Sequence, residues 1–401
     1  MALLPVETAL AQVLDGAAPV DAEEVPVAEA ASRVLARDLA ARRTQPPFDA
    51  SAMDGYAVRA ADTAQGARLR LVGESAAGRR FPGRLGPGEA VRIFTGAPVP
   101  DGADTILIQE NAGADGDAVT ALQSEPKGRF VRPKGLDFRE GDVLLRAGLR
   151  LEPRHVALAA AMNHAAIPVR RRPVIAILAT GDELVPPGGD PGPDQIVASN
   201  GVGLAAEVRL AGGAPLDLGI VPDRLDDTAQ AIAAAISARA DVLVTLGGAS
   251  VGEHDLVRRA LADAGMALAF WKIAMRPGKP LIFGRFDRLR VLGLPGNPVS
   301  SLVCAAVFLR PLIRALQGLS AALEGEAEAS LGRDLAANDE RQDYLRAGLE
   351  EDRGRLIATP FERQDSSMLA TLARADCLVI RPPHAPPARR GDSCRILRLS
   401  R

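Results

Sequence analysis

Three apolar runs in the middle of the chain each end in a glycine-bearing loop that leads into a helical pattern. The runs cover residues 174–178, 241–246 and 289–292. Short apolar runs without polar alternation are typical of strands that are buried on both faces. Their alternation with helical patterns over residues 173–318 predicts a parallel sheet with helices on both sides.

The loops that follow these three runs are predicted to lie together. Parallel strands share one direction, so their loops emerge at the same edge of the sheet, where ligands of such folds bind. Glycines let backbone amides approach an anion, and helix N-termini add partial positive charge. For a single loop, the better interpretation is that glycine and proline merely turn the chain. For three such loops at one edge of a sheet, that interpretation is weaker. The loops cover residues 180–183, 247–252 and 293–300.

Three cations lie close together just before a predicted strand. Lys272, Arg276 and Lys279 stand at spacings of four and three, which a solvated helix face would also produce. Pro277 and Gly278 argue against a helix at this place. We therefore predict a cation cluster directed at a dianion.

Four carboxylates occupy loops near the predicted anion site. Mg²⁺ takes one or two carboxylates together with phosphate oxygens, so these side chains are candidate metal ligands. Helix capping explains each one almost as well, and it suits Asp255 particularly. No pattern of a covalent nucleophile stands out in the sequence, so we predict metal-assisted substitution at phosphorus or at a metal. The four are Asp182, Glu183, Asp223 and Asp255.

The rest of the chain is predicted to form three further domains around the α/β domain. Residues 1–43 carry two helical patterns, the second from Pro26 to Leu39, and a helix in residues 148–172 is expected to pack back on them as one discontinuous N-terminal domain. Residues 44–147, rich in glycine, proline and short β-type runs, predict a β-rich domain. Residues 319–401 predict a small β-barrel or sandwich.

Charge and cysteine content narrow the class of protein. The net charge is −2, which argues against a nucleic-acid or membrane-surface binder. The first thirty residues lack the pattern of a signal peptide, and no apolar run looks long enough to cross a bilayer. Three widely spaced cysteines fit a reducing compartment. We therefore expect a cytoplasmic protein with a small-molecule substrate and without nucleic-acid or membrane partners.

Short segments along nearly the whole chain carry a family resemblance. They are Ser51-Ala52-Met53-Asp54-Gly55-Tyr56-Ala57, Thr95-Gly96-Ala97-Pro98-Val99-Pro100, Thr180-Gly181-Asp182-Glu183-Leu184, Gly247-Gly248-Ala249-Ser250-Val251-Gly252, Pro277-Gly278-Lys279-Pro280 and Leu294-Pro295-Gly296-Asn297-Pro298-Val299-Ser300. In this order they resemble the landmarks of the molybdopterin molybdotransferases, the MoeA family, to which the gephyrin E domain is related. Residues 341–346 and 367–375 are similar to the family's C-terminal pattern.

The resemblance implies a fold and a reaction. The family forms homodimers with four domains per chain, and its α/β domain is related to the molybdopterin-adenylyltransferase fold. The implied reaction takes adenylylated molybdopterin and molybdate, uses Mg²⁺, releases AMP and gives molybdenum cofactor. The active cleft is expected between the α/β domain of one chain and the second domain of the other, and the molybdopterin adenylyltransferase is a possible partner.

The resemblance also assigns roles to individual residues. Asp223 and Asp255 are expected to bind Mg²⁺, and Lys279, Arg276 and Ser300 to bind molybdate and phosphate. With the loops above, the predicted catalytic residues are Asp54, Asp137, Glu183, Asp255, Lys272 and Lys279. The predicted cofactor-binding residues are Thr95, Gly181, Asp182, Gly247, Gly248, Ser250, Arg276, Pro295, Gly296, Asn297, Pro298 and Ser300.

Two positions depart from the family pattern. Arg276 stands where bacterial members often have lysine, and Ala198 stands where the family usually has an acidic residue.

Two other functions compete with that of a molybdotransferase. One rival function is that of the adenylyltransferase one step earlier, which would need only the α/β domain. The other is a non-catalytic scaffold on the same fold, as in animal relatives that bind receptor peptides.

Overall fold

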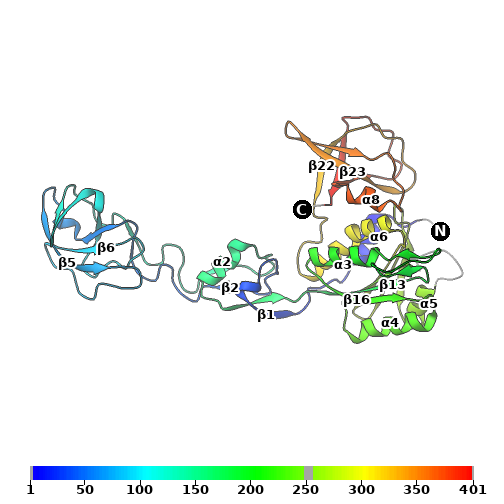
Figure 1. The fold of residues 1–401 in the computed structure, drawn as a ribbon, viewed down its shortest axis with the longest axis horizontal. Coiled ribbons are helices and arrows are strands. Elements are labelled where there is room, and N and C mark those ends of the chain that lie inside the picture. The colour runs from blue at the N-terminus through cyan, green and yellow to red at the C-terminus, as the bar shows by residue number, and fades with distance from the viewer. Residues whose placement is uncertain (1–2, 248–255, 400–401) are drawn as a thin grey trace. The chain divides into compact units, whose positions relative to one another are not determined.

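The computed structural model describes residues 3–247 and 256–399. The chain, which Figure 1 colours by residue number from the N-terminus to the C-terminus, divides into two compact units. The first unit comprises Met1–Glu23, Ser32–Val34 and Arg170–Arg401, and the second comprises Glu24–Ala31 and Leu35–Val169.

A six-stranded sheet forms the centre of the first unit. Its strand order is β16-β13-β17-β21-β20-β18, and the first four of these strands run parallel. The parallel arrangement predicted for the three apolar runs is confirmed, because they form the adjacent strands β13, β17 and β21. The bounds are β13 (Val174–Thr180), β16 (Ala214–Val221), β17 (Val242–Leu246), β18 (Ala267–Lys272), β20 (Pro280–Phe286) and β21 (Leu289–Leu294).

One edge of this sheet is antiparallel. β20 pairs antiparallel with both β21 and β18. Only Asp287 and Arg288 connect β20 to β21, and so short a link closes a hairpin, whereas a parallel connection needs a crossover of a dozen residues or more. β18 therefore runs in the direction of the parallel strands, and its carboxyl end reaches their edge of the sheet.

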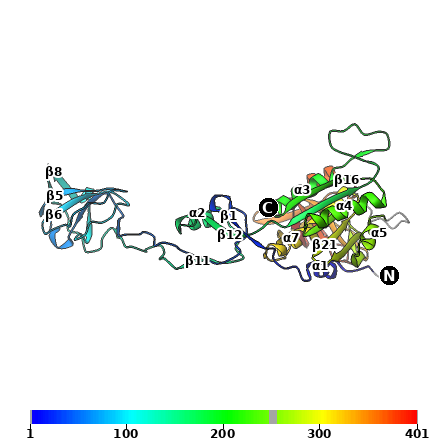
Figure 2. The same ribbon diagram turned by 90° about the horizontal axis from the view of Figure 1, so that it is seen from below.

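Helices cover both faces of the sheet. Ile175 and Ile177 of β13 share an apolar cluster with α1, α3, α6 and α7, whereas Ala176 and Leu178 share another with α4 and α5. Figure 2 shows these helices around the sheet from a second side. The bounds are α1 (Val6–Leu14), α3 (Asn200–Leu210), α4 (Leu225–Ser237), α5 (Leu256–Asp263), α6 (Pro298–Cys304) and α7 (Arg310–Leu316).

The longest helix corrects one prediction. α6, a π-helical turn over Ala305–Leu309 and α7 follow one another without a break, which gives a strongly apolar helix of 19 residues. Its length and composition would allow it to cross a membrane, so the prediction that no run is long enough was wrong. The apolar part of this helix is 83% buried within the unit, as is typical of a core helix.

The N-terminal residues contain one helix and not two. α1 packs into the core of the α/β part, but the helix predicted from Pro26 to Leu39 is wrong. Only the ends of that segment lie in strands, where β1 pairs with β12 and β2 with β11, and Leu35 between them forms a single bridge to Val169. Pairing with distant residues therefore overrides the local helical pattern. The bounds are β1 (Ala22–Pro26), a 3₁₀ turn (Val27–Glu29), β2 (Leu39–Ala40), β11 (Val143–Leu145) and β12 (Ala166–Arg170).

The C-terminal residues form a closed barrel, which decides between the two predicted alternatives. The ring order is β23-β24-β22-β26-β25, and β25 pairs back onto β23. β19 (Met275–Arg276), which belongs to the α/β part, joins this sheet by pairing parallel with β23. The bounds are β22 (Glu326–Leu331), β23 (Gln342–Asp352), β24 (Arg355–Pro360), β25 (Cys377–Arg381) and β26 (Ser393–Arg398).

The second unit contains a six-stranded sheet and a smaller mixed part. The sheet order is β7-β4-β6-β5-β9-β8, which confirms a β-rich region. In the mixed part, α2 (Pro153–Ala161) packs against Val25, Leu35 and Leu39. The boundaries of the four domains stay a prediction. The bounds are β4 (Gly55–Val58), β5 (Arg68–Ser75), β6 (Glu89–Ile93), β7 (Thr105–Ile108), β8 (Ala112–Asp115) and β9 (Ala118–Ala121).

Candidate active site

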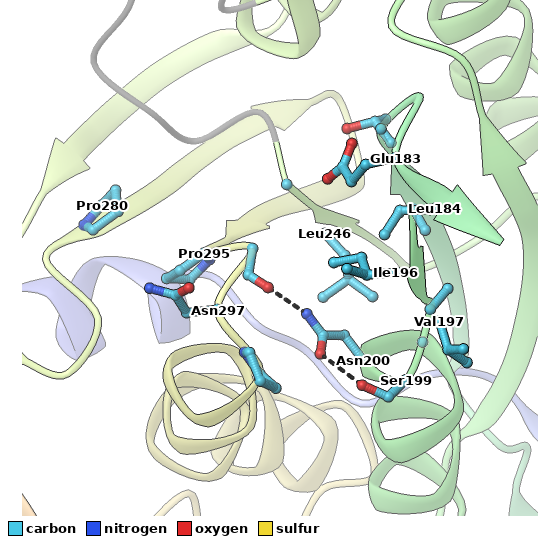
Figure 3. A pocket seen from close by; sticks show the side chains of 18 of the residues that line it. Glu183, Leu184, Ile196, Val197, Ser199, Asn200, Leu246, Pro280, Pro295 and Asn297 are labelled. Atoms are coloured by element: carbon cyan, nitrogen blue, oxygen red, sulfur yellow. Dashed lines mark hydrogen bonds between the residues drawn. The ribbon is translucent and has the colours of Figure 1, made fainter. Parts of the chain in front are cut away.

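A cavity of about 770 Å³ opens at the carboxyl edge of the central sheet. Gly181 after β13, Gly247 after β17 and residues 295–298 after β21 all line it (Figure 3). The predicted convergence of the three loops is confirmed for the parts that the structure describes. The rest of the second loop, with Gly248 and Ser250, lies outside the described residues.

Close backbone contact at Gly247 explains why a glycine stands there. Its φ is +96°, in the left-handed region that other residues rarely adopt. A Cβ at Gly247 would lie 2.8 Å from the carbonyl oxygen of Thr180, and a Cβ at Gly296 would lie 3.8 Å from the Cα of Gly247. The three loops therefore approach one another through their backbones, and a side chain at Gly247 would push the first two loops apart.

The loop after β21 is held from two directions. The side-chain amide of Asn200, the first residue of α3, donates a hydrogen bond of 2.6 Å to the carbonyl oxygen of Gly296 (Figure 3). From the C-terminal barrel, the hydroxyl of Ser366 accepts from the Asn297 side chain at 3.0 Å, and its carbonyl accepts from the Val299 amide at 3.2 Å. The barrel therefore helps to shape a cavity that belongs to the α/β part.

Two lysines bring positive charge to the cavity. Lys272 ends β18, Lys279 precedes β20, and both line the cavity. The amide of Ile273 donates to the carbonyl of Lys279 at 3.1 Å, which holds the two ends of the connecting loop together. The Lys272 ammonium lies 3.9 Å from the centre of the Trp271 ring. An anion in the cavity would meet both cations.

The structure does not bring the third predicted cation into the cavity. The Nε atom of Arg276 donates to Asp343 at 2.7 Å, and its Nη1 atom donates to Asp339 at 3.0 Å. β19 pairs with barrel strand β23, and this pairing directs the Arg276 guanidinium to acidic groups more than sixty residues further along the chain. Ser300 does not line the cavity either, because it is buried within α6.

Three of the predicted carboxylates lie close together at the cavity. Glu183 and Asp223 line it, and the carboxylate of Asp182 accepts from the Asp223 amide at 3.2 Å. Burial, followed by the negative charges of Asp182 and Glu183, raises the pKa of Asp223. A divalent cation would relieve this repulsion, and Mg²⁺ takes one or two carboxylates together with phosphate oxygens.

The structure describes only part of the predicted metal site. Asp255, the other predicted metal ligand, lies outside the described residues. Within residues 3–247 and 256–399, no group of three or more acidic, histidine or cysteine side chains is arranged to hold a metal ion. Asp223 is therefore the predicted metal ligand that the structure places at the cavity.

Comparisons with known proteins match consecutive parts of the chain. Family models described as MoeA N-terminal region (domain I and II), probable molybdopterin binding domain, and MoeA C-terminal region (domain IV) match residues 4–163, 176–315 and 328–399. A molybdopterin molybdenumtransferase of Bacillus subtilis is 33% identical over 98% of this chain and 94% of its own length. Another, of a Nostoc species, is 37% identical over 90% of this chain and 85% of its own. The crystal structure of a molybdopterin biosynthesis MoeA protein from Pyrococcus horikosii covers all of both chains with a TM-score of 0.87 at 31% identity.

The chain belongs to the molybdopterin molybdenumtransferase family. It is a transferase of molybdenum cofactor biosynthesis, as its resemblance implied. The match includes the regions on both sides of the α/β domain, so the rival function of an adenylyltransferase made of that domain alone is not supported. Its relatives named molybdopterin molybdenumtransferase are enzymes, which likewise argues against the rival function of a non-catalytic scaffold.

In the second unit, two of the residues that the molybdenumtransferase resemblance predicts are in direct contact. The carboxylate of Asp54 accepts hydrogen bonds from the amide of Thr95 at 2.7 Å and from its hydroxyl at 2.8 Å. The Thr95 amide first, and then its hydroxyl, lower the pKa of Asp54. Asp137 is exposed, and its amide donates to the carbonyl of Gln45 at 3.1 Å.

The apolar side of the cavity was not predicted from the sequence. Leu184, Ile196, Val197 and Leu246 line it together with the polar residue Asn200. Ile196 and Val197 form β15 (Ile196–Val197), which pairs with β14 (Leu184–Val185) in a loop rich in proline and glycine. The two short apolar pairs Leu184-Val185 and Ile196-Val197 were the sequence feature that could have predicted this apolar side. Ala198, noted as a departure from the family pattern, also lines the cavity.

Proposed function

We propose that the chain inserts molybdate into adenylylated molybdopterin and releases AMP at this cavity. One observation carries the proposal: three glycine loops and two lysines meet at one cavity that carboxylates also line. Phosphate groups and molybdate are oxyanions, and lysine ammonium groups and backbone amides bind such groups.

The lining residues divide into two kinds of contact with the substrate. Lys272 and Lys279 are proposed to hold the anionic groups, with help from backbone amides near Gly181, Gly247 and Gly296. The apolar side chains are proposed to contact the flat rings of the substrate, because such pockets combine apolar walls with a few placed polar groups. This apolar wall consists of Leu184, Ile196, Val197 and Leu246.

Mg²⁺ is proposed as the cofactor of this reaction. Asp223 and Asp255 are the proposed ligands, and Glu183 and Asp182 add negative charge beside Asp223. When bound, Mg²⁺ neutralises phosphate charge and so stabilises AMP as it leaves. The protein's own part is to hold the carboxylates on one side of the cavity and the lysines within reach of the same anion.

The proposal includes an assembly and a location. The proposed form is a cytoplasmic homodimer in which a second copy contributes Asp54, Thr95 and Asp137 to the site. The molybdopterin adenylyltransferase is the proposed partner that delivers the substrate. Sedimentation velocity of the full chain would test the dimer, and a monomer at micromolar concentration would contradict it.

AMP release tests the proposed reaction directly. The full chain is incubated with adenylylated molybdopterin, with and without molybdate and Mg²⁺, and AMP is measured by chromatography. We expect release that needs both additions and that falls at least about tenfold in Lys279→Met, because a cation in contact with the anion is lost. Lys127→Met, at an exposed lysine of the second unit, is the matched control and should keep full activity. Release that is independent of molybdate and Mg²⁺ would contradict the proposal.

A further inference from the structure

Trp271 is the only tryptophan of the chain, and it directly precedes Lys272, which lines the cavity. Its half-buried ring packs against the apolar cluster under α4 and α5. Two cations approach the ring, with the Lys272 ammonium 3.9 Å and the Arg258 guanidinium carbon 5.7 Å from its centre. One of these cations, Lys272, also lines the cavity. The ring therefore links the apolar core to a charged group of the site.

An irregular strand end makes the contact between Trp271 and Lys272 possible. Successive side chains of a regular strand point to opposite faces of the sheet, so neighbours rarely touch. The pairing of β18 with β20 shifts register between Phe270 and Lys272, and such irregularities redirect side chains. The Lys272 ammonium can therefore lie over the preceding ring while its side chain lines the cavity.

The contact with the Trp271 ring restricts the flexible side chain of Lys272. Lysine carries its charge on a four-carbon stem that samples many rotamers when it is free. The face of an indole ring attracts an ammonium group at this distance, and tryptophan is the best side chain for the purpose. Restricting the stem beforehand lowers the entropy that binding an anion would otherwise cost.

We propose that Trp271 is a positioning residue, whose ring holds the Lys272 ammonium at the cavity wall in readiness for the anionic part of the substrate. The inference rests on the proposed function, since it requires an anion in this cavity. Trp271 acts through Lys272, since Lys272 lines the cavity and Trp271 is not one of the lining residues.

Steady-state kinetics of AMP release test this role. Trp271→Leu removes the ring face, and we expect KM for adenylylated molybdopterin to rise about fivefold while kcat changes less than twofold. Trp271→Phe keeps a ring and should return KM to within twofold of the wild type. Phe286→Leu is the matched control, because it removes a ring from the same apolar cluster and should leave KM unchanged. Equal KM increases in Trp271→Leu and Phe286→Leu, or none in Trp271→Leu, would overturn the inference.

Fluorescence of the single tryptophan tests the contact without any substrate. Lys272→Met removes the charge at similar side-chain length, and we expect it to change the emission of Trp271, whereas Lys279→Met should leave the emission unchanged. Identical emission in the wild type and Lys272→Met would overturn the inference. A wild type that releases no AMP would overturn the proposed function, and the emission of Lys272→Met would still decide whether Trp271 holds this lysine.

Discussion

The side-chain amide of Asn200 lies 2.6 Å from the carbonyl oxygen of Gly296 and joins the start of α3 to the loop after β21, 96 residues further along the chain. Asn200→Ala removes the donor, so the loop after β21 loses one of its two supports. We expect AMP release to fall about tenfold, since small displacements of substrate-positioning groups cost this much or more. Val202→Ala, at a side chain of α3 that is 61% exposed, is the control. Equal rates in Asn200→Ala and the wild type would show that the bond does not position the loop.

Gly247 and Gly219 form a matched pair for a test of backbone approach. Both have positive φ, +96° and +81°, but a Cβ at Gly247 would lie 2.8 Å from the Thr180 carbonyl, whereas a Cβ at Gly219 would meet nothing within 4 Å. Alanine at either position should lower the free energy of unfolding by about 1–3 kcal/mol through backbone strain. Only Gly247→Ala should also lower AMP release, by at least about tenfold. The prediction fails if the two variants lose activity equally.

The pKa of Asp54 should depend on Thr95. The Thr95 amide, and to a smaller extent its hydroxyl, hold this pKa below the ordinary value of 3.8. Thr95→Val keeps the amide and removes the hydroxyl, so we expect the pKa to rise only part of the way. Thr95→Ser keeps both donors and should leave the pKa unchanged. Carboxyl NMR titration, assigned with Asp54→Asn, measures it, and an unchanged value in Thr95→Val would contradict the role of the hydroxyl.

The sign of the accompanying stability change follows from linkage. A carboxylate whose pKa is lower in the folded state stabilises the fold fully above its ordinary value and loses this contribution as pH falls through the folded value. The loss for Asp54 therefore lies in the acidic range below about 3.8 in the wild type. In Thr95→Val the same loss should be smaller and should finish at a higher pH.

Arg276 and Asp343 should couple energetically across β19 and β23. They lie directly opposite each other in register, and Asp343 is buried. Arg276→Lys cannot supply the two-pronged donor, so we expect a lower thermal midpoint and partial loss of AMP release. A double-mutant cycle with Asp343→Asn should give a coupling of about 1 kcal/mol, at the lower end for contacting residues because Arg276 is partly exposed. Additive effects of the two changes would show that the pair does not act as a unit.

Much of the α/β part could be predicted because its strands and loops have local sequence patterns. Buried parallel strands appear as apolar runs, and their shared direction places their loops at one edge without further information. Lys272 was predicted from its place in a cluster of cations, and the structure puts it at the cavity because β18 runs in the direction of the parallel strands. The helix predicted at Pro26 to Leu39 failed because strand pairing with β11 and β12 outweighs a weak local pattern.

The contacts that sequence analysis missed join residues that are distant in the chain. Arg276 looked like a third cavity cation, because its spacing from Lys272 and Lys279 gives no sign of Asp343. No role was predicted for Asn200, whose hydrogen-bond partner is a backbone carbonyl and so leaves no mark in the sequence. Such pairings depend on the closed fold, so no local pattern in the chain reveals them.

The sharing of β19 between two parts of the first unit bears on how the chain can be divided. Tyr344, Leu378 and Ile380 of the barrel belong to the same apolar cluster as Met275, so the barrel is not an appendage on a linker. A shortened chain that ended near residue 318 would leave β19 with an unpaired edge and this cluster open to water. We expect such a fragment to aggregate, because exposed strand edges and large apolar patches promote association. In this protein, the α/β part and the C-terminal barrel look like separate domains in the sequence, but neither is independent of the other.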